Sequence, residues 1–228
     1  MLLSAAIWIP IGAGVLALAA GERHSRWVAL AGAIAGFLVT IPLYTGFDLQ
    51  NPGFQFQADL SWIPQFNIRY HLGVDGISLL FVLLNSFITI LVVVAGWTAI
   101  ENRVAQYNAA FLVMSGLLNG VFSALDAVLF YVFFEATLIP MFIIIGVWGG
   151  PNRVYAAVKF FLYTLLGSLL MLVALLYLYQ KSGGSFAIVD WHKLPLTLEA
   201  QKWLFFGFLL AFAVKVPMWP VHTWLPDA

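Results

Sequence analysis

Residues 127–148 read AVLFYVFFEATLIPMFIIIGVW, and this run sets the class of fold. A helix of this length reaches roughly 33 Å at 1.5 Å per residue, enough to cross the ~30 Å hydrocarbon core of a bilayer. The run holds a single charged residue, Glu135, and a helix-breaking residue, Pro140, follows it. The run therefore predicts a membrane-spanning helix that is interrupted close to a carboxylic acid.

The composition of the whole chain agrees with a membrane protein. The chain has 228 residues, of which 63% are hydrophobic and 9% charged, whereas about a quarter of the residues of a soluble domain are charged. Its 10 basic and 10 acidic residues balance, and the sequence holds no basic cluster that would predict a nucleic-acid partner. It has no cysteine, no ligand-spaced pair of histidines or carboxylates and no glycine-rich phosphate loop. We therefore expect no metal, nucleotide or redox cofactor in this chain.

About seven apolar segments are long enough to span a bilayer. They are predicted near residues 2–20, 27–46, 76–98, 107–124, 126–148, 155–179 and 202–222. The first is expected to be an uncleaved span, because residues 1–6 lack the positive charge of a signal peptide. The segment 47–75 is rich in turn residues and predicts a short hairpin at the membrane surface. The predicted fold is all-α: a polytopic transmembrane helix bundle with a proline-broken helix near its C-terminal end.

The placement of Lys and Arg predicts the orientation. The loops after the predicted odd-numbered spans are short, while Lys and Arg on the other side fall in two long loops, where single charges constrain topology less. We therefore expect the N-terminus to lie outside.

Two glycine pairs, Gly32/Gly36 and Gly116/Gly120, predict close helix packing. Asn85, Ser86 and Thr89 share a helix face that forms interhelical hydrogen bonds or lines a hydrated path; the sequence leaves both open.

Two opposite charges lie deep in predicted spans. Glu135 falls about 14 Å along its span, and Lys215 about 18 Å past Trp203, so both approach the bilayer midplane. A charge at the midplane costs about 2.5–3.5 kcal/mol on insertion scales, and such groups commonly mark an ion or proton path. The alternative is a buried ion pair that only holds two helices together, although desolvation makes such pairs weak stabilisers.

Three prolines accompany these two charges. Pro140, Pro217 and Pro220 each remove a backbone hydrogen bond to the residue four positions earlier, and we expect the freed carbonyls to open an ion site. Two further residues are candidates for a proton path. Lys159 either lines the path or extends to the membrane surface, and His222 can titrate near neutral pH. Asp75 and Asp126 are expected to be helix N-caps.

Four stretches carry a family resemblance: HLGVDGISLLFVLL at 71–84, FFEATLIPMFIIIGVWGG at 133–150, RVYAAVKFFLYT at 153–164 and FAVKVPMWPVHTWLPDA at 212–228. On these stretches the chain resembles the subunit M family of bacterial respiratory NADH–quinone oxidoreductase (complex I), the counterpart of mitochondrial subunit 4. The broader family includes multisubunit cation/proton antiporters and membrane-bound hydrogenases.

The resemblance implies a larger architecture and a role for each site residue. Family members have about fourteen spans with two inverted repeats, each with a broken helix. By this likeness, residues 1–106 hold the N-terminal spans with an outer loop at 47–75, residues 107–228 begin the repeat, and the sequence ends roughly halfway through the family length. Glu135 and Lys215 match the charged pair of the first half-channel, in which the lysine takes a proton from the cytoplasmic side and the glutamate tunes its affinity. Lys159 and His222 match candidates for the water-linked route.

The expected function is proton translocation coupled to electron transfer from NADH to quinone. By the resemblance, FMN, iron–sulfur clusters and quinone belong to partner subunits, and the chain's partners are neighbouring antiporter-like subunits in the bacterial inner membrane. Two alternatives stay open. One is a subunit of a multisubunit sodium/proton antiporter, and the other is a scaffold subunit whose ion pair is purely structural.

Overall fold

The computed structural model describes residues 1–228, which form two compact units. Unit 1 consists of Met1–Leu60 and Tyr70–Leu125, and unit 2 consists of Ser61–Arg69 and Asp126–Ala228. The compact units thus divide after Leu125, not at residue 106. The predicted division at 106/107 concerns the family repeat, and it stays a prediction.

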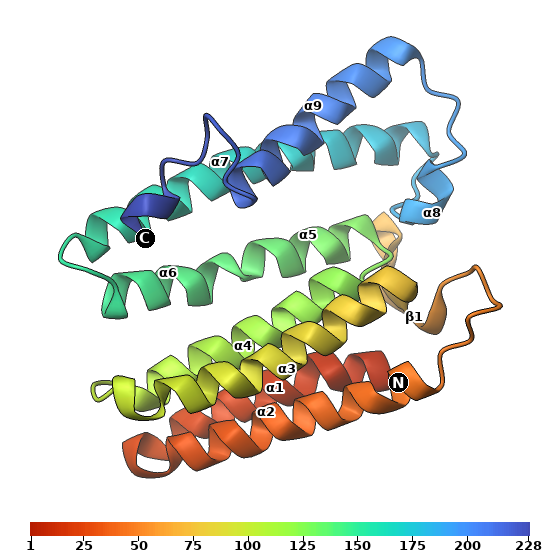
Figure 1. Ribbon diagram of the computed structural model, residues 1–228. Helices are drawn as coiled ribbons and strands as arrows, with labels where there is room; N and C mark the ends of the chain where they lie inside the picture. Colours follow the sequence, from red (N-terminus) through yellow and green to blue (C-terminus); the bar gives the residue numbers. More distant parts are fainter. The chain divides into compact units, whose positions relative to one another are not determined.

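Unit 1 is a bundle of four helices: α1 (Leu2–Ala19), α2 (Gly21–Thr45), α3 (Gly76–Ala99) and α4 (Val104–Ser123). Figure 1 shows them side by side, with α1 packed on α2 and α4, and α3 packed on α2 and α4. A Cβ atom at Gly32 would overlap the Cβ of Ala13, and one at Gly116 would overlap the carbonyl of Ile7. The predicted glycine faces are therefore confirmed as close helix contacts with α1.

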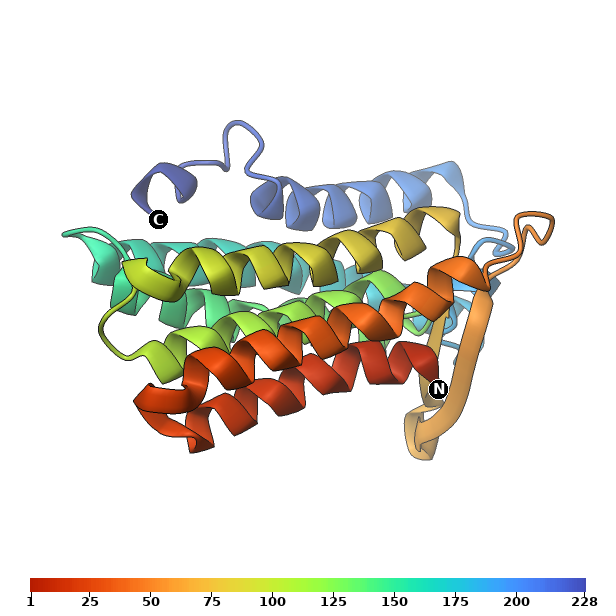
Figure 2. The same ribbon diagram turned by 60° about the horizontal axis from the view of Figure 1, so that its bottom comes forward.

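A β-hairpin joins α2 to α3. Its strands are β1 (Gln55–Ile63) and β2 (Ile68–Val74), and the 3₁₀ turn η1 (Pro64–Phe66) lies between them (Figure 2). Asn67 closes the turn with φ 54°, a left-handed conformation that asparagine tolerates better than most residues. The predicted hairpin in segment 47–75 is confirmed, and it is the two-stranded exception in an otherwise helical chain.

Unit 2 is built around one long helix, α7 (Arg153–Lys181). The other elements are α5 (Ala127–Ala136), α6 (Leu138–Trp148), α8 (Ile188–Trp191), α9 (Leu198–Lys215) and the 3₁₀ turn η2 (Leu225–Asp227). α7 packs against α5, α6, α9 and η2. The core between α6, α7, α9 and the C-terminal segment comprises Leu138, Ile145, Ala156, Ala157, Phe160, Val214 and Trp224. The central helix therefore reaches every element that carries a candidate site residue.

The helical segments agree with the predicted spans, with one correction. By length and composition, α1, α2, α3, the combined run Ala127–Trp148 and α7 can each cross a membrane. α4 and α9 are helices of 20 and 18 residues. The predicted seventh span, 202–222, is wrong at its end, because α9 begins at Leu198 and stops at Lys215. Pro217 and Pro220 supply no backbone N–H donors, so the helix cannot continue past the lysine.

Candidate functional site

The run 127–148 is interrupted at one residue, Thr137, which separates α5 from α6. Pro140 is the third residue of α6 and has no N–H to bond the carbonyl of Ala136. The hydroxyl of Thr137 donates to the carbonyl of Phe134 at 2.7 Å, so its oxygen keeps lone pairs for another donor. The break therefore presents a buried hydroxyl two residues after Glu135.

Lys215 is the last residue of α9, and its ammonium group is bound at this break. Its Nζ donates to Thr137 Oγ1 at 3.2 Å and lies 4.5 Å from the ring centroid of Phe134. The ring face attracts a cation, and the C-terminal end of α9 also favours positive charge. The lysine is thus stabilised by a hydroxyl, a π-face and a helix end.

Glu135 lies near Lys215 but is not its direct partner. The two side chains are close enough to interact electrostatically, yet no ion pair within 4.0 Å joins them. The Oε1 atom of Glu135 is buried and has no hydrogen-bond partner, and Ser168 and Tyr131 neighbour its carboxyl group. The structure therefore brings the two predicted residues into one site. In this site Lys215 is hydrogen-bonded to Thr137 and not to the carboxylate of Glu135. We call Glu135, Thr137 and Lys215, with the ring of Phe134, the Lys215 site.

The chain that follows α9 folds back and bonds the end of that helix. The N–H of Met218 donates to the carbonyl of Ala213 at 2.8 Å, and the indole N–H of Trp224 donates to the carbonyl of Val214, also at 2.8 Å. The expectation that Pro217 leaves the Ala213 carbonyl free is therefore wrong, because a donor five residues later replaces the missing one. Trp224, which is 5% exposed, also packs on Phe160 of α7 with 5.0 Å between ring centroids.

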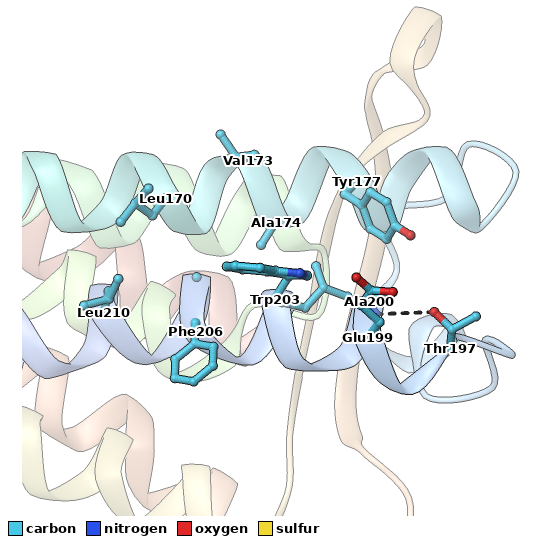
Figure 3. Close-up of a pocket in the computed structure, with 12 residues that line it drawn as sticks. Leu170, Val173, Ala174, Tyr177, Thr197, Glu199, Ala200, Trp203, Phe206 and Leu210 are labelled. Carbon is cyan, nitrogen blue, oxygen red and sulfur yellow. Dashed lines mark hydrogen bonds between the residues drawn. The ribbon is translucent and has the colours of Figure 1, made fainter.

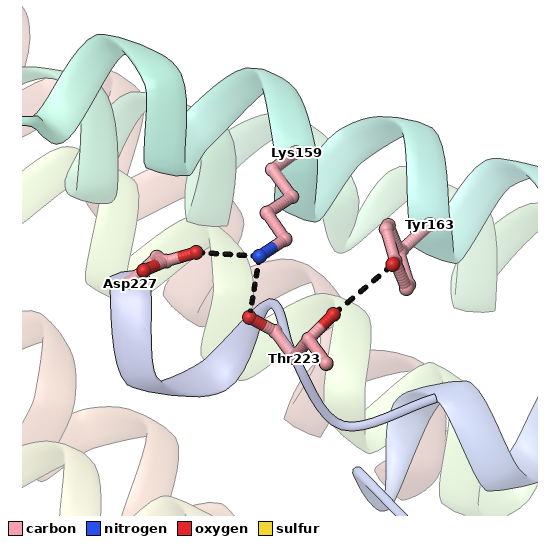
Figure 4. A network of polar contacts seen from close by, with 4 residues as sticks. All are labelled: Lys159, Tyr163, Thr223 and Asp227. Carbon is pink, nitrogen blue, oxygen red and sulfur yellow. Dashed lines mark hydrogen bonds and ion pairs between the residues drawn. The ribbon is translucent and has the colours of Figure 1, made fainter. Parts of the chain in front are cut away.

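Lys159 is bound to the same returning segment (Figure 4). Its Nζ donates to Asp227 Oδ2 at 2.6 Å and to the carbonyl of Thr223 at 2.8 Å. The hydroxyl of Thr223 in turn donates to the hydroxyl of Tyr163 at 3.0 Å. Lys159 lies nine positions before Ser168 on α7, roughly 14 Å along the helix. It therefore belongs to a second polar cluster, separate from the Lys215 site.

His222 lies between these two clusters in sequence, and no contact joins it to either lysine. Its side chain is half-buried, and the Nδ1 atom is buried without a hydrogen-bond partner. The role of His222 on a proton path therefore stays a prediction.

Unit 2 also has a groove away from the Lys215 site. It lies between the other ends of α7 and α9, has a volume of about 570 Å³, and is lined mainly by apolar side chains, with Trp203 along it and Glu199 at one end (Figure 3). None of its lining residues belongs to the Lys215 site. Glu135 and Lys215 therefore do not lie in this groove.

Unit 1 holds a different polar cluster, between α3, α4 and α1. Asn119 donates to the carbonyl of Ala6 at 2.9 Å and to Ser86 Oγ at 3.1 Å, and it accepts from Asn85 at 2.8 Å. Thr89 donates to Ser115 Oγ at 2.7 Å. We call this cluster the Asn119 network; its bonds confirm interhelical hydrogen bonds for Asn85, Ser86 and Thr89, and the hydrated path stays a prediction.

Both predicted N-caps are confirmed. Asp75 accepts from the backbone of Ile77 and Ser78, and Asp126 accepts from Val128 and Leu129.

No group of three or more histidine, cysteine or carboxylate residues in the chain could hold a metal ion.

Sequence reasoning missed three residues that the structure brings into play. Thr137 was hidden because threonine is common in spans, although its place between a carboxylate and a proline was a usable signal. Trp224 and Asp227 fall in the stretch HTWLPDA, and their partners, Val214 and Lys159, lie outside it, 10 and 68 residues earlier in the chain. Only the fold shows those pairings.

Sequence comparisons identify known proteins to which the chain is similar. A family model described as NADH:quinone oxidoreductase/Mrp antiporter, transmembrane, matches residues 124–228. The chain is 49% identical to NADH-quinone oxidoreductase subunit M of Rhodobacter capsulatus, over 100% of this chain and 48% of the relative. It is 43% identical to NADH-ubiquinone oxidoreductase chain 4 of Arabidopsis thaliana, over 99% of this chain and 46% of the relative.

A solved structure agrees with the sequence relatives. A chain of respiratory complex I from Thermus thermophilus with bound NADH superposes with a TM-score of 0.87 at 36% identity, covering 99% of this chain and 46% of that chain. The chain thus spans about half the length of the curated relatives it matches.

Proposed function

The chain belongs to the NADH:quinone oxidoreductase/Mrp antiporter family, as a homologue of subunit M, and from this premise we propose that it serves as a proton-translocating subunit of an NADH–quinone oxidoreductase. In this proposal Lys215 carries the proton and Glu135 sets how firmly the lysine holds it. The observation that carries the proposal is the ammonium of Lys215 at the Thr137 break, with an unpaired carboxylate oxygen of Glu135 nearby.

This geometry allows the lysine two partners. In the observed arrangement Lys215 binds a neutral hydroxyl, which stabilises its charge less than a carboxylate does. A small movement toward Glu135 would replace that contact with an ion pair, in which each group stabilises the charge of the other. Separation of the pair favours release of the proton from the lysine, and formation of the pair favours uptake. The protons of the two groups are therefore coupled, and neither group titrates alone.

We propose further that the chain is a multi-pass protein of the bacterial inner membrane, with its N-terminus outside, among neighbouring antiporter-like subunits. Electron transfer from NADH to quinone would use FMN and iron–sulfur clusters in partner subunits. In that assembly this chain contributes the proton-carrying side chains, and the energy arrives from elsewhere in the complex. Lys159 and His222 remain candidates for the route by which protons reach Lys215.

The test uses Glu135→Gln and Lys215→Met in the complete protein within its native membrane complex. Proton uptake by inside-out vesicles and NADH oxidation are measured together. Each change should lower proton uptake per NADH roughly tenfold or more, because one of the two midplane charges is lost. Glu199→Gln and Lys202→Met, which alter exposed residues of α9, are the matched controls and should leave the ratio unchanged. Normal uptake with normal NADH oxidation in the first pair would refute the proposal.

A sodium/proton antiporter subunit is the second candidate, and the Mrp antiporters named in the matching family favour it. The Lys215 site would then serve a proton that exchanges for sodium. Vesicles loaded with different sodium concentrations distinguish the two. Proton movement that follows the sodium gradient without NADH supports antiport, and proton movement that requires NADH oxidation supports the first proposal.

A purely structural ion pair is the third possibility, and the geometry counts against it. A pair that fastens two helices should be in contact, yet Lys215 binds Thr137 and not Glu135. The double change Glu135→Leu with Lys215→Leu removes both charges and keeps apolar volume. We expect assembly to persist while proton uptake is lost; full proton uptake in this variant would instead favour the structural role.

A further inference from the structure

Residues 216–228 follow α9 and form no long helix. One ion pair joins them to α7. Lys159 Nζ and Asp227 Oδ2 are 2.6 Å apart, and their side chains are 18% and 38% exposed. Lys159 Nζ also donates to the carbonyl of Thr223, and the hydroxyl of Thr223 donates to Tyr163, four residues further along α7 (Figure 4). Lys159 is the seventh residue of α7, a long apolar helix in which an uncompensated charge is unfavourable. Asp227 supplies the compensating charge.

The same segment is joined to the residue before Lys215. Trp224, three residues before Asp227, donates its indole N–H to the carbonyl of Val214 at 2.8 Å. Its ring packs on Phe160, the neighbour of Lys159 on α7, with 5.0 Å between centroids. The attachment of the segment and the end of α9 are therefore linked by a short series of contacts. A shift of Asp227 would act on Trp224, and through it on the backbone that carries Lys215.

We propose that Asp227 is a positioning residue for Lys215. Its ion pair with Lys159 anchors residues 216–228 on α7, and Trp224 transfers that constraint to the last turn of α9. The lysine is thereby held where its ammonium meets Thr137. This inference deepens the proposed function, and only its transport consequence rests on that function.

A labelling experiment tests the positioning itself. Residues 1–228 contain no cysteine. Lys215→Cys in the complete protein, in native membranes and with any cysteine outside these residues replaced by serine, is therefore a single reporter in this subunit for a water-soluble maleimide. Asp227→Ala should raise the labelling rate of the reporter at least about threefold, because the end of α9 is no longer held. Asp227→Glu should leave the rate unchanged. The exchange of charges, Lys159→Asp with Asp227→Lys, should return it to the starting rate.

A second reporter separates local release from unfolding. Ala110→Cys is buried in unit 1 and should stay unlabelled in every Asp227 variant. If Asp227→Ala exposes this reporter too, Asp227→Asn, which keeps the shape and an acceptor oxygen, replaces it in the comparison. An unchanged rate at the Lys215→Cys reporter in Asp227→Ala, or in Asp227→Asn where that variant is used, would overturn the inference.

A transport measurement completes the test and separates the two proposals. With Lys215 present, Asp227→Ala should lower proton uptake per NADH about fivefold, Asp227→Glu should keep the wild-type ratio, and Glu199→Ala should have no effect. If labelling responds as expected while Glu135→Gln and Lys215→Met still transport protons, the positioning role stands and the proposed function fails. If those two variants lose transport while labelling ignores Asp227, the positioning role fails alone.

Discussion

The Asn119 network of unit 1 and the Lys215 site of unit 2 are both polar clusters inside apolar helices, but they are bonded differently. Asn119 uses its amide group fully, with two donated bonds and one accepted bond at 2.8–3.1 Å. Lys215 has one hydrogen bond, to Thr137 at 3.2 Å, and Glu135 Oε1 has none. The network is neutral, whereas the site is charged.

This difference indicates what each cluster can do. A fully bonded network in a low-dielectric interior resists rearrangement, because any movement leaves a buried polar group unpaired. Lys215 has one long hydrogen bond, and a buried carboxylate oxygen of Glu135 without a partner lies within electrostatic reach, so a second acceptor is available to the ammonium. We therefore expect the Asn119 network to fix helices and the Lys215 site to change state, and three variants can break or sharpen that comparison.

Asn119→Ala is expected to have the largest effect, and on stability. It removes three interhelical bonds and leaves the Ala6 carbonyl without its Asn119 donor, while the Asn85 amide keeps only its bonds to Ser115. A loss of about 2 kcal/mol follows from the cost of buried unpaired groups and from hydrogen bonds measured between membrane helices. Thermal inactivation of the purified complex in detergent and the amount assembled in membranes measure it.

The control for this variant is transport normalised to assembled protein. Proton uptake per NADH should stay at the wild-type ratio in Asn119→Ala, since the network is predicted to be structural. If proton uptake per NADH falls in the assembled Asn119→Ala complex, the Asn119 network also carries protons. The comparison between the two clusters would then fail.

Thr137→Val should have the next largest effect, and on transport. Valine keeps the shape of threonine but offers no oxygen, so Lys215 loses its hydrogen-bond partner. Hydrogen bonds to charged groups contribute about 1.5–3 kcal/mol, so proton uptake per NADH should fall roughly tenfold. Thr137→Ser restores the hydroxyl and should restore uptake. If valine transports like threonine, the hydroxyl is not part of the working site.

Much of the fold follows from the sequence because its signals are local. Apolar length gave the helices, turn residues at 47–75 gave the hairpin, and glycine spacing gave the contacts of Gly32 and Gly116 with α1. The end of α9 was predicted too late, at 222, since prolines are tolerated in many membrane helices. Two prolines three residues apart remove two donors in one turn, and the helix stops at Lys215.

The candidate site was only partly predictable because its contacts are not local. Estimated depth brought Glu135 and Lys215 together, and they do lie within electrostatic reach. Depth could not show that Thr137, 78 residues from Lys215, takes the hydrogen bond. It could not show either that Asp227 compensates Lys159, because rotation about each helix axis decides which side chains meet.

Asp75→Ala should have the smallest effect. It tests whether the carboxylate of Asp75 in unit 1 has only a structural role. Asp75 caps α3 by accepting from the N–H groups of Ser78 at 2.8 Å and Ile77 at 3.1 Å. Loss of such a cap costs about 1 kcal/mol. Proton uptake per NADH should not change, and Asp75→Asn should retain most of the stability because asparagine is an equally good cap.

The charge on Asp75 adds a pH dependence that isolates its contribution. The backbone N–H of Ser78, bonded to the carboxylate, lowers the pKa of Asp75 below its ordinary value. A carboxylate whose pKa is depressed by folding stabilises the protein fully above its unfolded pKa of about 3.9, and the benefit disappears as pH falls through the lower, folded value. The stability gap between wild type and Asp75→Ala should thus narrow below about pH 4, while the gap between Asp75→Asn and Asp75→Ala should not. A wild-type gap that ignores pH would mean that the carboxylate acts by hydrogen bonding alone.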